Sequence, residues 1–337
     1  MNRSMMMAVA GAMMAKAGEH KGGGGGTAPF PSEPVKTPAE LAAEAGGVKP
    51  GNELGAAAST AVGAVLDFEG DAGAGMEGAD KDSFAIPFIL VLQPLSPVVV
   101  EKTVPGAEAG MFMNSVTNEL VRELYLIPCA FQRRWIRWGA REAGGGFKGE
   151  FTTAQATQIQ ASGEVKNLEG RLYYPAADGS INPKRDDRLV DTRTHFLLAI
   201  GSVGGDLAFP AAFPLSSSGV KVSKNWMSRI DGIKLRKGNV PTGELYTPPS
   251  FSHIYKATTH LEKNEKGSWY LPDIVNVLGA DGKAQSVTNV RIYAQAKAFS
   301  KSVLDGATQV AYETMNKAGG EGGSDGPRAE GSDGRGF

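Results

Sequence analysis

A short stretch of the chain, residues 129–138, interleaves aromatic rings with guanidinium groups in the order CAFQRRWIRW. Apolar, aromatic and β-branched residues dominate it, which predicts a β-strand. Alternate side chains of a strand point to opposite faces. One face would then present Phe131, Arg133, Trp135 and Arg137, and the other Ala130, Gln132, Arg134, Ile136 and Trp138.

The first of these faces suits a single nucleic-acid strand. Bases stack on aromatic rings and arginine pairs with phosphate. We therefore expect Ile136 and Trp138 to lie in the core and the Trp135 face to line a groove. The same alternation also fits an ordinary amphipathic strand, with tryptophan in the core and arginine in solvent.

Two further segments contain residue types that could bind nucleic acid. Residues 220–230 predict a helix that Ser217 or Ser218 could cap, with Lys221 and Lys224 on one face and Trp226 nearby. Lysines and hydroxyls of this kind bind backbone phosphate, although a surface helix anchored by Trp226 fits equally well. Trp269, in a predicted strand over residues 268–277, is a further candidate for stacking.

The sequence contains no recognisable catalytic or metal-binding motif. We find no nucleophile elbow, phosphate loop, zinc-protease helix or calcium loop. Cys129 is the only cysteine, and the four histidines lack the spacing of metal ligands. We therefore expect a protein that is not an enzyme, with no catalytic residue, metal or cofactor.

Composition divides the 337 residues into three parts. Residues 1–83 are rich in Ala, Gly and Pro and hold 6 Lys+Arg against 11 Asp+Glu, which predicts a disordered arm. Residues 84–316 hold 26 basic against 21 acidic residues and predict one folded domain, whose mild positive charge permits a polyanion partner without demanding one; this is the candidate nucleic-acid-binding domain. Residues 317–337 predict a disordered tail that ends in Phe337.

The folded part reads as several strands of uneven spacing with a few helices. This pattern predicts an α+β, mainly β fold: an OB-like antiparallel barrel or sheet with peripheral helices. Residues 184–193 are densely charged and predict a solvated loop. The expected strands lie in 84–92, 111–117, 120–138, 194–200, 208–214, 251–259 and 268–277, and the expected helices in 152–160, 220–230 and 290–304.

The first residues are open to two interpretations. Arg3 precedes a weakly apolar run over residues 5–14, which a secretory signal would also show, whereas a disordered N-terminus needs no such function. Elsewhere no apolar run reaches the length that spans a bilayer, so we expect no membrane partner.

Several strings together resemble a family of tailed-bacteriophage proteins, some of which are taken to be single-stranded DNA-binding proteins. The similarity spans roughly residues 84–304 and is strongest in PFILVLQ (87–93), AGMFMNSVT (109–117), IPC (127–129), FQRRWIRW (131–138), DTR (191–193), KNW (224–226) and KGSWY (266–270). Phage proteins of this class commonly use an OB-type barrel and an acidic tail with a terminal aromatic that docks replication proteins. Phe337 matches the terminal aromatic, but the tail holds four acids against three bases.

The resemblance and the residues together predict a single-stranded DNA-binding protein of phage replication or recombination, acting in the host cytoplasm. Its partners would be single-stranded DNA and, through Phe337, phage replication proteins. A virion or capsid-associated structural protein is the first alternative. A recombination or nuclease accessory factor is the second, with Asp186, Asp187 and Asp191 as its first candidate residues.

Overall fold

The structure is a computed structural model that describes residues 70–79, 83–201, 203–205, 207–265, 267–308 and 310–313. The chain divides into two units, Met1–Glu77 and Gly78–Phe337. The described part of the first unit, residues 70–77, forms turns. The predicted arm, apart from residues 70–79 and 83, lies outside the described residues, as does the predicted tail with Phe337.

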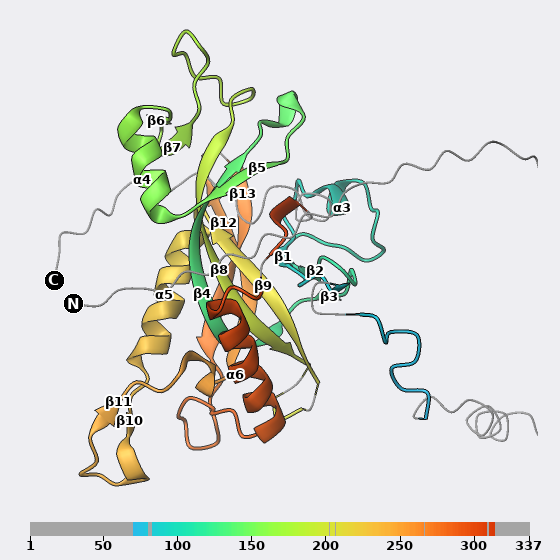
Figure 1. The fold of residues 1–337 in the computed structure, drawn as a ribbon, viewed down its shortest axis with the longest axis vertical. Helices are drawn as coiled ribbons and strands as arrows, with labels where there is room; N and C mark the ends of the chain where they lie inside the picture. Colours follow the sequence, from blue (N-terminus) through green and yellow to red (C-terminus); the bar gives the residue numbers. More distant parts are fainter. Residues whose placement is uncertain are drawn as a thin grey trace, which may run out of the picture. The chain divides into compact units, whose positions relative to one another are not determined.

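The second unit is built around a curled antiparallel sheet that forms a half-barrel (Figure 1). Its strands run in the order β13-β12-β4-β8-β7-β6, with β5 paired to β4 and β9 paired to β8. The prediction of a mainly β, antiparallel fold with peripheral helices is confirmed. The strands are β4 (Leu124–Trp138), β5 (Phe147–Phe151), β6 (Lys166–Leu168), β7 (Arg171–Tyr173), β8 (Arg188–Ile200), β9 (Ala208–Ser216), β12 (Tyr255–Asn264) and β13 (Gly267–Asn276).

Short elements complete the unit. A second antiparallel sheet joins β1 (Ile89–Val91), β2 (Phe112–Asn114) and β3 (Leu120–Val121), and a small hairpin joins β10 (Leu235–Arg236) and β11 (Leu245–Tyr246). Pro87 precedes β1, which lies at an edge of this three-stranded sheet, where proline is tolerated. The α-helices in the described unit are α3 (Pro97–Val100), α4 (Thr153–Ser162), α5 (Gly219–Gly232) and α6 (Val290–Leu304).

The β1 segment reaches toward both open ends of the half-barrel. On one side the amide of Ala212 in β9 donates to the carbonyl of Pro87 at 2.9 Å. On the other, the side-chain amide of Gln93 pairs with both backbone groups of Tyr270 in β13, at 2.8 and 3.0 Å. Unpaired edges expose hydrogen-bonding groups. These contacts satisfy some of the backbone hydrogen-bonding groups at the β9 and β13 edges, although the β1 segment forms no continuous ladder with either strand.

The two longest strands, β4 and β8, are paired along most of their length. Pro128 faces Leu197 and Ala130 faces Phe196, so Cys129 is an extra residue in β4. Such a bulge puts two successive residues out of strict alternation. From Ala130 onward the pairing is regular, and the alternation predicted for residues 130–138 is retained.

The sheet buries both faces, each beneath a different helix. On one face, Trp226 of α5 packs with Leu126, Leu197, Phe213 and Tyr255 from four strands. The other face contacts α6 and the segment that contains Tyr312; its buried residues include Ile127, Leu198, Ile292 and Ala296 in one cluster, and Phe88, Ile136, Trp138 and Tyr312 in another. We call these the α5 face and the α6 face.

Local sequence explains where the helices begin and which sides they bury. Thr152 and Gln155 form a capping box at the start of α4, and Asn289 caps α6 by accepting from two backbone amides. The buried positions of α6 recur every three or four residues, so one side of the helix faces the sheet. The helix predicted over residues 290–304 is confirmed.

The prediction of a solvated loop over the densely charged residues 184–193 was wrong for residues 188–193. Residues 188–193 are not loop but the first half of β8, which pairs with β4 across Arg188 to Arg193. The carboxylate of Asp191 is compatible with this strand because Arg133 of β4 and Arg193 of β8 pair with it, and the pairing with β4 is not visible in the local sequence.

The bulge residue Cys129 should be chemically inert in the folded protein. Its side chain is 2% exposed, and burial raises the pKa of its thiol to about 12. At pH 8 a shift of this size lowers the thiolate fraction roughly a thousandfold, and the thiolate is the reactive form. We expect a thiol reagent to label the native protein at least about a hundredfold more slowly than the protein in denaturant. Equal labelling rates would contradict this burial.

Candidate nucleic-acid interface

The structure places the four residues of the predicted β4 face on the same side of the strand. From Ala130 to Trp138 the strand alternates, and Ile136 and Trp138 are buried in the α6 face. Phe131, Arg133, Trp135 and Arg137 therefore share the opposite, α5 face, and all four are half-buried. The ring of Phe131 nevertheless packs against the ring of His195, with the two centroids 5.1 Å apart.

The arginines of this face do not present free guanidinium groups, which corrects the sequence prediction. Arg133 donates from Nε and Nη2 to the two carboxylate oxygens of Asp191, at 2.8 and 2.9 Å. Arg137 donates to Asp187 at 2.8 and 2.6 Å and lies over the ring of Tyr174. The two arginine side chains remain 38% and 36% exposed, so part of each guanidinium still reaches solvent.

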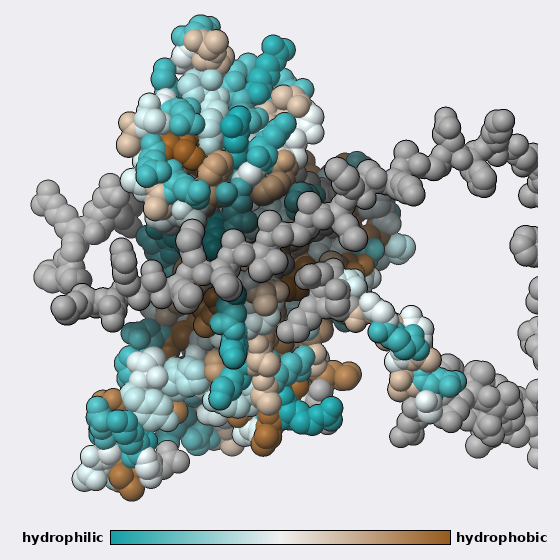
Figure 2. Space-filling view, in the orientation of Figure 1, coloured by the Kyte–Doolittle hydropathy of each residue, from teal (hydrophilic) through white to brown (hydrophobic). Residues whose placement is uncertain are grey.

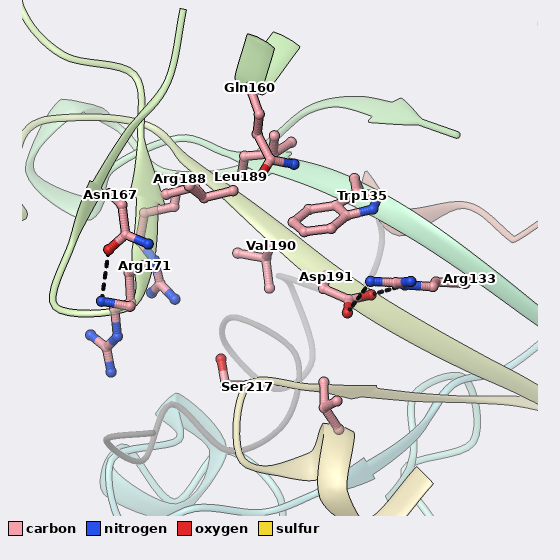
Figure 3. A pocket seen from close by; sticks show the side chains of 13 residues that line it. Arg133, Trp135, Gln160, Asn167, Arg171, Arg188, Leu189, Val190, Asp191 and Ser217 are labelled. Atoms are coloured by element: carbon pink, nitrogen blue, oxygen red, sulfur yellow. Dashed lines mark hydrogen bonds and ion pairs between the residues drawn. The ribbon is translucent and has the colours of Figure 1, made fainter. Parts of the chain in front are cut away.

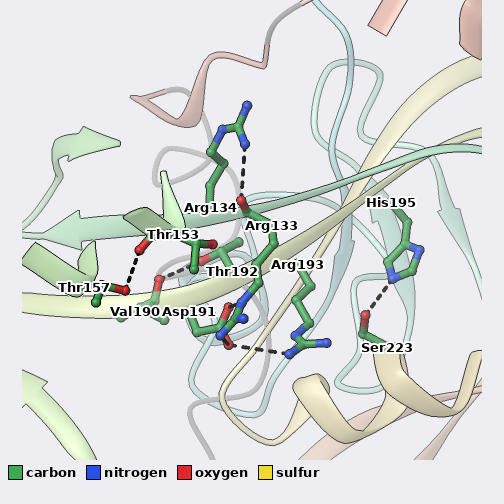
Figure 4. Close-up of polar contacts among 10 residues, drawn as sticks. All are labelled: Arg133, Arg134, Thr153, Thr157, Val190, Asp191, Thr192, Arg193, His195 and Ser223. Atoms are coloured by element: carbon green, nitrogen blue, oxygen red, sulfur yellow. Dashed lines mark hydrogen bonds and ion pairs between the residues drawn. The ribbon is translucent and has the colours of Figure 1, made fainter. Parts of the chain in front are cut away.

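Asp191 is shared between two arginines. Arg193, two residues further along β8, approaches it at 3.7 Å, while Arg133 holds it bidentately from β4 (Figure 4). The hydrogen bonds that Arg133 donates to Asp191 raise the pKa of Arg133 above its ordinary value. Two guanidinium groups against one carboxylate leave a local surplus of positive charge.

A cavity of about 280 Å³ opens beside this cluster on the α5 face (Figure 3). Arg133 and Asp191 lie at one end of it, and Arg171 and Arg188 lie at the other. The ring of Trp135 projects between them. The lining residues are Arg133, Trp135, Gln160, Asn167, Gly170, Arg171, Leu172, Arg188, Leu189, Val190, Asp191, Ser217 and Val220.

The described part of the cavity wall comes from five segments: β4, α4, the β6–β7 hairpin, β8 and the turn into α5. Trp135 packs against a small cluster around Ala156, Val165 and Leu189, which joins α4 to the sheet. The β6–β7 hairpin supplies Asn167 and Arg171, and the turn into α5 supplies Ser217 and Val220. Hydrophilic side chains predominate over the end of the molecule that carries α4, β6 and β7 (Figure 2). The cavity combines an apolar wall, which includes Trp135 and Leu189, with arginines at both of its ends.

Trp226 does not belong to any interface, and this part of the prediction was wrong. Its side chain is 1% exposed and stacks on the ring of His195, with centroids 4.4 Å apart. A base could reach it only if α5 left the sheet. Lys221 and Lys224 are exposed on the outer side of the same helix, so they remain available for phosphate.

Trp269 lies on a different face from Trp135. Its neighbours Tyr270 and Ile274 pack in the α5-face cluster. Trp269 is an odd number of residues from both, so alternation places it on the opposite face of β13. We therefore omit Trp269 from the candidate interface. Phe337, the predicted partner-binding residue, lies outside the described residues.

A family model described as Pam3 phage gp34-like protein matches residues 55–309, about three quarters of the chain. The chain belongs to the Pam3 phage gp34-like protein family. The phage origin that the sequence resemblance implied is therefore confirmed. No curated protein and no solved structure matches the chain. The family description names no ligand or activity, so a function for this gp34-like protein has to be argued from its site.

Two arginines of the gp34-like cavity escaped the sequence analysis. Arg171 lies in the short strand β7, and Arg188 begins β8 inside the charged segment that was predicted to be a solvated loop. From residue 190 to residue 195, the polar residues Asp191, Arg193 and His195 alternate with β-branched residues. This period of two was the signal that could have extended the predicted strand toward the N-terminus. No local signal indicates that Arg171 and Trp135 line the same cavity, because 36 residues separate them in the sequence.

Metal binding finds no support among the residues that the structure describes. Within them no group of three or more His, Cys, Asp or Glu side chains could hold an ion. Asp186, Asp187 and Asp191, the candidate residues of a nuclease accessory factor, do not form such a group, and two of them pair with arginine. Over the same residues, none of the helices is both long enough and apolar enough to cross a bilayer.

Proposed function

We propose that this gp34-like protein binds single-stranded DNA in the infected host cell and is not an enzyme. The observation that supports this proposal is the cavity on the α5 face. The half-buried ring of Trp135 lies there between arginines from β4, β7 and β8. Single-stranded nucleic acid is bound by this combination of a stacking ring and a cationic groove.

The roles within the interface differ from those the sequence suggested. Arg133 is held by Asp191 and serves to fix the ring of Trp135, whose centroid lies 5.5 Å from the guanidinium carbon. Arg171 lies at the end of the cavity away from Asp191 and is the residue that we assign to phosphate contact; Arg188 also lines this end. Lys221 and Lys224 on α5 extend positive charge outward from the turn that contains Ser217.

Replacing Trp135 by leucine should weaken DNA binding while the fold is retained. Leucine keeps an apolar side chain against the α4 cluster but offers no ring for a base. One stacked base contributes about 1–3 kcal/mol, so we expect the Kd for oligo-dT to rise roughly 5- to 150-fold. Fluorescence polarisation with labelled oligo-dT, at two salt concentrations, measures this change and the loss of affinity with salt.

Trp269→Leu is the matched control, because it removes a second half-buried tryptophan from the opposite face of the sheet. It should leave the Kd unchanged. Equal weakening by both variants would contradict the location of the interface. A folded wild-type protein that binds no oligo-dT at low salt would contradict the proposed function itself.

A further inference from the structure

We infer that single-stranded DNA bound at the cavity beside Trp135 continues along the outer side of α5, where Lys221, Lys224 and Arg229 contact its phosphates. This inference rests on the proposed function and extends its site beyond the cavity. Three features of α5 support it: the residue types on its outer side, the place where it begins, and the partners of the charges that follow it.

The outer side of α5 carries basic and uncharged polar side chains. Spacings of three or four residues put five exposed positions on this side, which are Lys221, Lys224, Asn225, Ser228 and Arg229. Lysine and arginine pair with phosphate, and the side chains of serine and asparagine donate to its oxygens. Residues 221–229 contain no aspartate or glutamate, so no carboxylate of this segment repels a phosphate backbone.

The three cations of this side have no carboxylate partner among the residues that the structure describes. Lys221, Lys224 and Arg229 form no ion pair within that part of the chain. Arg133 and Arg137 in the sheet, by contrast, are each bonded to an aspartate. The α5 cations can therefore contact phosphate without giving up a carboxylate.

The beginning of α5 connects its outer side to the cavity. Ser217 precedes the helix and Val220 lies in its first turn, and both line the cavity (Figure 3). Lys221 is the next residue along the helix. A strand that places one base against Trp135 and leaves the cavity at this wall therefore meets Lys221 first. The cavity and the outer side of α5 form one continuous site for a polyanion.

The basic side chains that follow α5 already have partners, which sets the far end of the path. The contacts join Lys234 to Asp231 at 3.2 Å, Lys237 to Glu244 at 2.6 Å, and Arg236 to the carbonyl of Gly243 at 2.9 Å. The path therefore runs from Lys221 to Arg229, over which the helix rises about 12 Å. At the spacing of about 3.4 Å that phosphates have along one strand of B-DNA, this length spans about four phosphates.

The salt dependence of oligo-dT binding by the full-length protein tests this path. The variant replaces Lys221, Lys224 and Arg229 together by glutamine, which has a helix propensity close to that of lysine and arginine. Each phosphate contact contributes about 0.7 to the slope of log K against log salt concentration for single strands. Losing three contacts should reduce the magnitude of the slope by about 2. Fluorescence polarisation measures the slope, and circular dichroism verifies that the variant is folded.

A triple variant of α6 is the matched control. Arg291, Lys297 and Lys301 are exposed on that helix, and no residue of α6 is among the described residues that line the cavity. Glutamine at these three positions removes the same charge and should leave the slope unchanged. An equal reduction of the slope by both triple variants would mean that DNA responds to the net charge of the protein, and it would overturn the path along α5.

The outcomes separate this inference from the proposed function. If Trp135→Leu weakens binding while the folded α5 variant keeps the wild-type slope, the path along α5 is wrong and the interface at the cavity stands. If the triple α5 variant is not folded, Lys221→Gln and Lys224→Gln are measured singly, and each should reduce the slope by about 0.7. Unchanged slopes for both single variants would overturn the path. If the wild-type protein binds no oligo-dT, both proposals fail.

Discussion

Replacing Trp226 by alanine is expected to lower the free energy of unfolding by about 3–5 kcal/mol, the usual cost of removing a buried large aromatic side chain. Trp226 is fully enclosed between α5 and the sheet. Its ring stacks on His195 at 4.4 Å and meets Tyr255 edge-on at 5.8 Å. The cavity left by alanine would separate these rings and loosen the helix. Chemical denaturation followed by circular dichroism measures the loss.

Lys224→Ala is the control on the same helix. Lys224 is exposed two residues before Trp226, and surface substitutions of this kind stay within about ±0.5 kcal/mol. If Trp226→Ala kept full stability and lost only DNA binding, the residue would be an interface residue after all. The contrast between neighbouring positions therefore decides between a role in the core and a role in binding.

The successful predictions from the sequence concern burial within a single helix or strand, where the periodic pattern of that element is sufficient. Alternation placed Ile136 and Trp138 on the buried side of β4, and helical spacing placed residues 290–304 in α6. In both cases the burial of a side chain follows from its own position in a periodic segment. The bulge at Cys129 did not disturb the prediction, because it lies before the aromatic part of the strand.

What the sequence could not predict is the pairing of charges between distant segments. Arg133 meets Asp191 across 58 residues and Arg137 meets Asp187 across 50. From the sequence alone both arginines looked free for phosphate, and both aspartates looked like solvated loop residues. Only the register of β4 against β8 brings them together, and this register also creates the cationic cavity.

The pairing changes which arginines can act on a ligand. A guanidinium that already has a bidentate carboxylate partner loses that partner if it turns fully toward phosphate. Arg133 and Arg137 are therefore better suited to shaping the α5 face than to gripping a strand. Among the described residues that line the cavity, Asp191 is the only acidic one, whereas Arg133, Arg171 and Arg188 are basic.

Acid should destabilise the protein through His195, in the range from about pH 6.5 down to about pH 3. The side chain is 1% exposed and bonded to the hydroxyl of Ser223 at 2.8 Å. Burial, with the nearby charge of Arg193, lowers its pKa to about 3. Between this value and the unfolded value near 6.5, the unfolded chain binds the proton and the folded chain does not. Stability is therefore complete above this range and falls as the pH falls through it.

The size of the effect follows from the same linkage. From pH 6.5 to pH 4.5 the loss due to His195 alone should be about 2 kcal/mol. Other groups titrate in this range, so the measurement is the difference in slope between wild type and His195→Gln, which keeps an amide for Ser223 but cannot bind the proton. Identical slopes for wild type and His195→Gln would mean that His195 is already charged, or solvated, in the fold. In that case water would reach the stack of Phe131, His195 and Trp226, which anchors α5 beside the cavity.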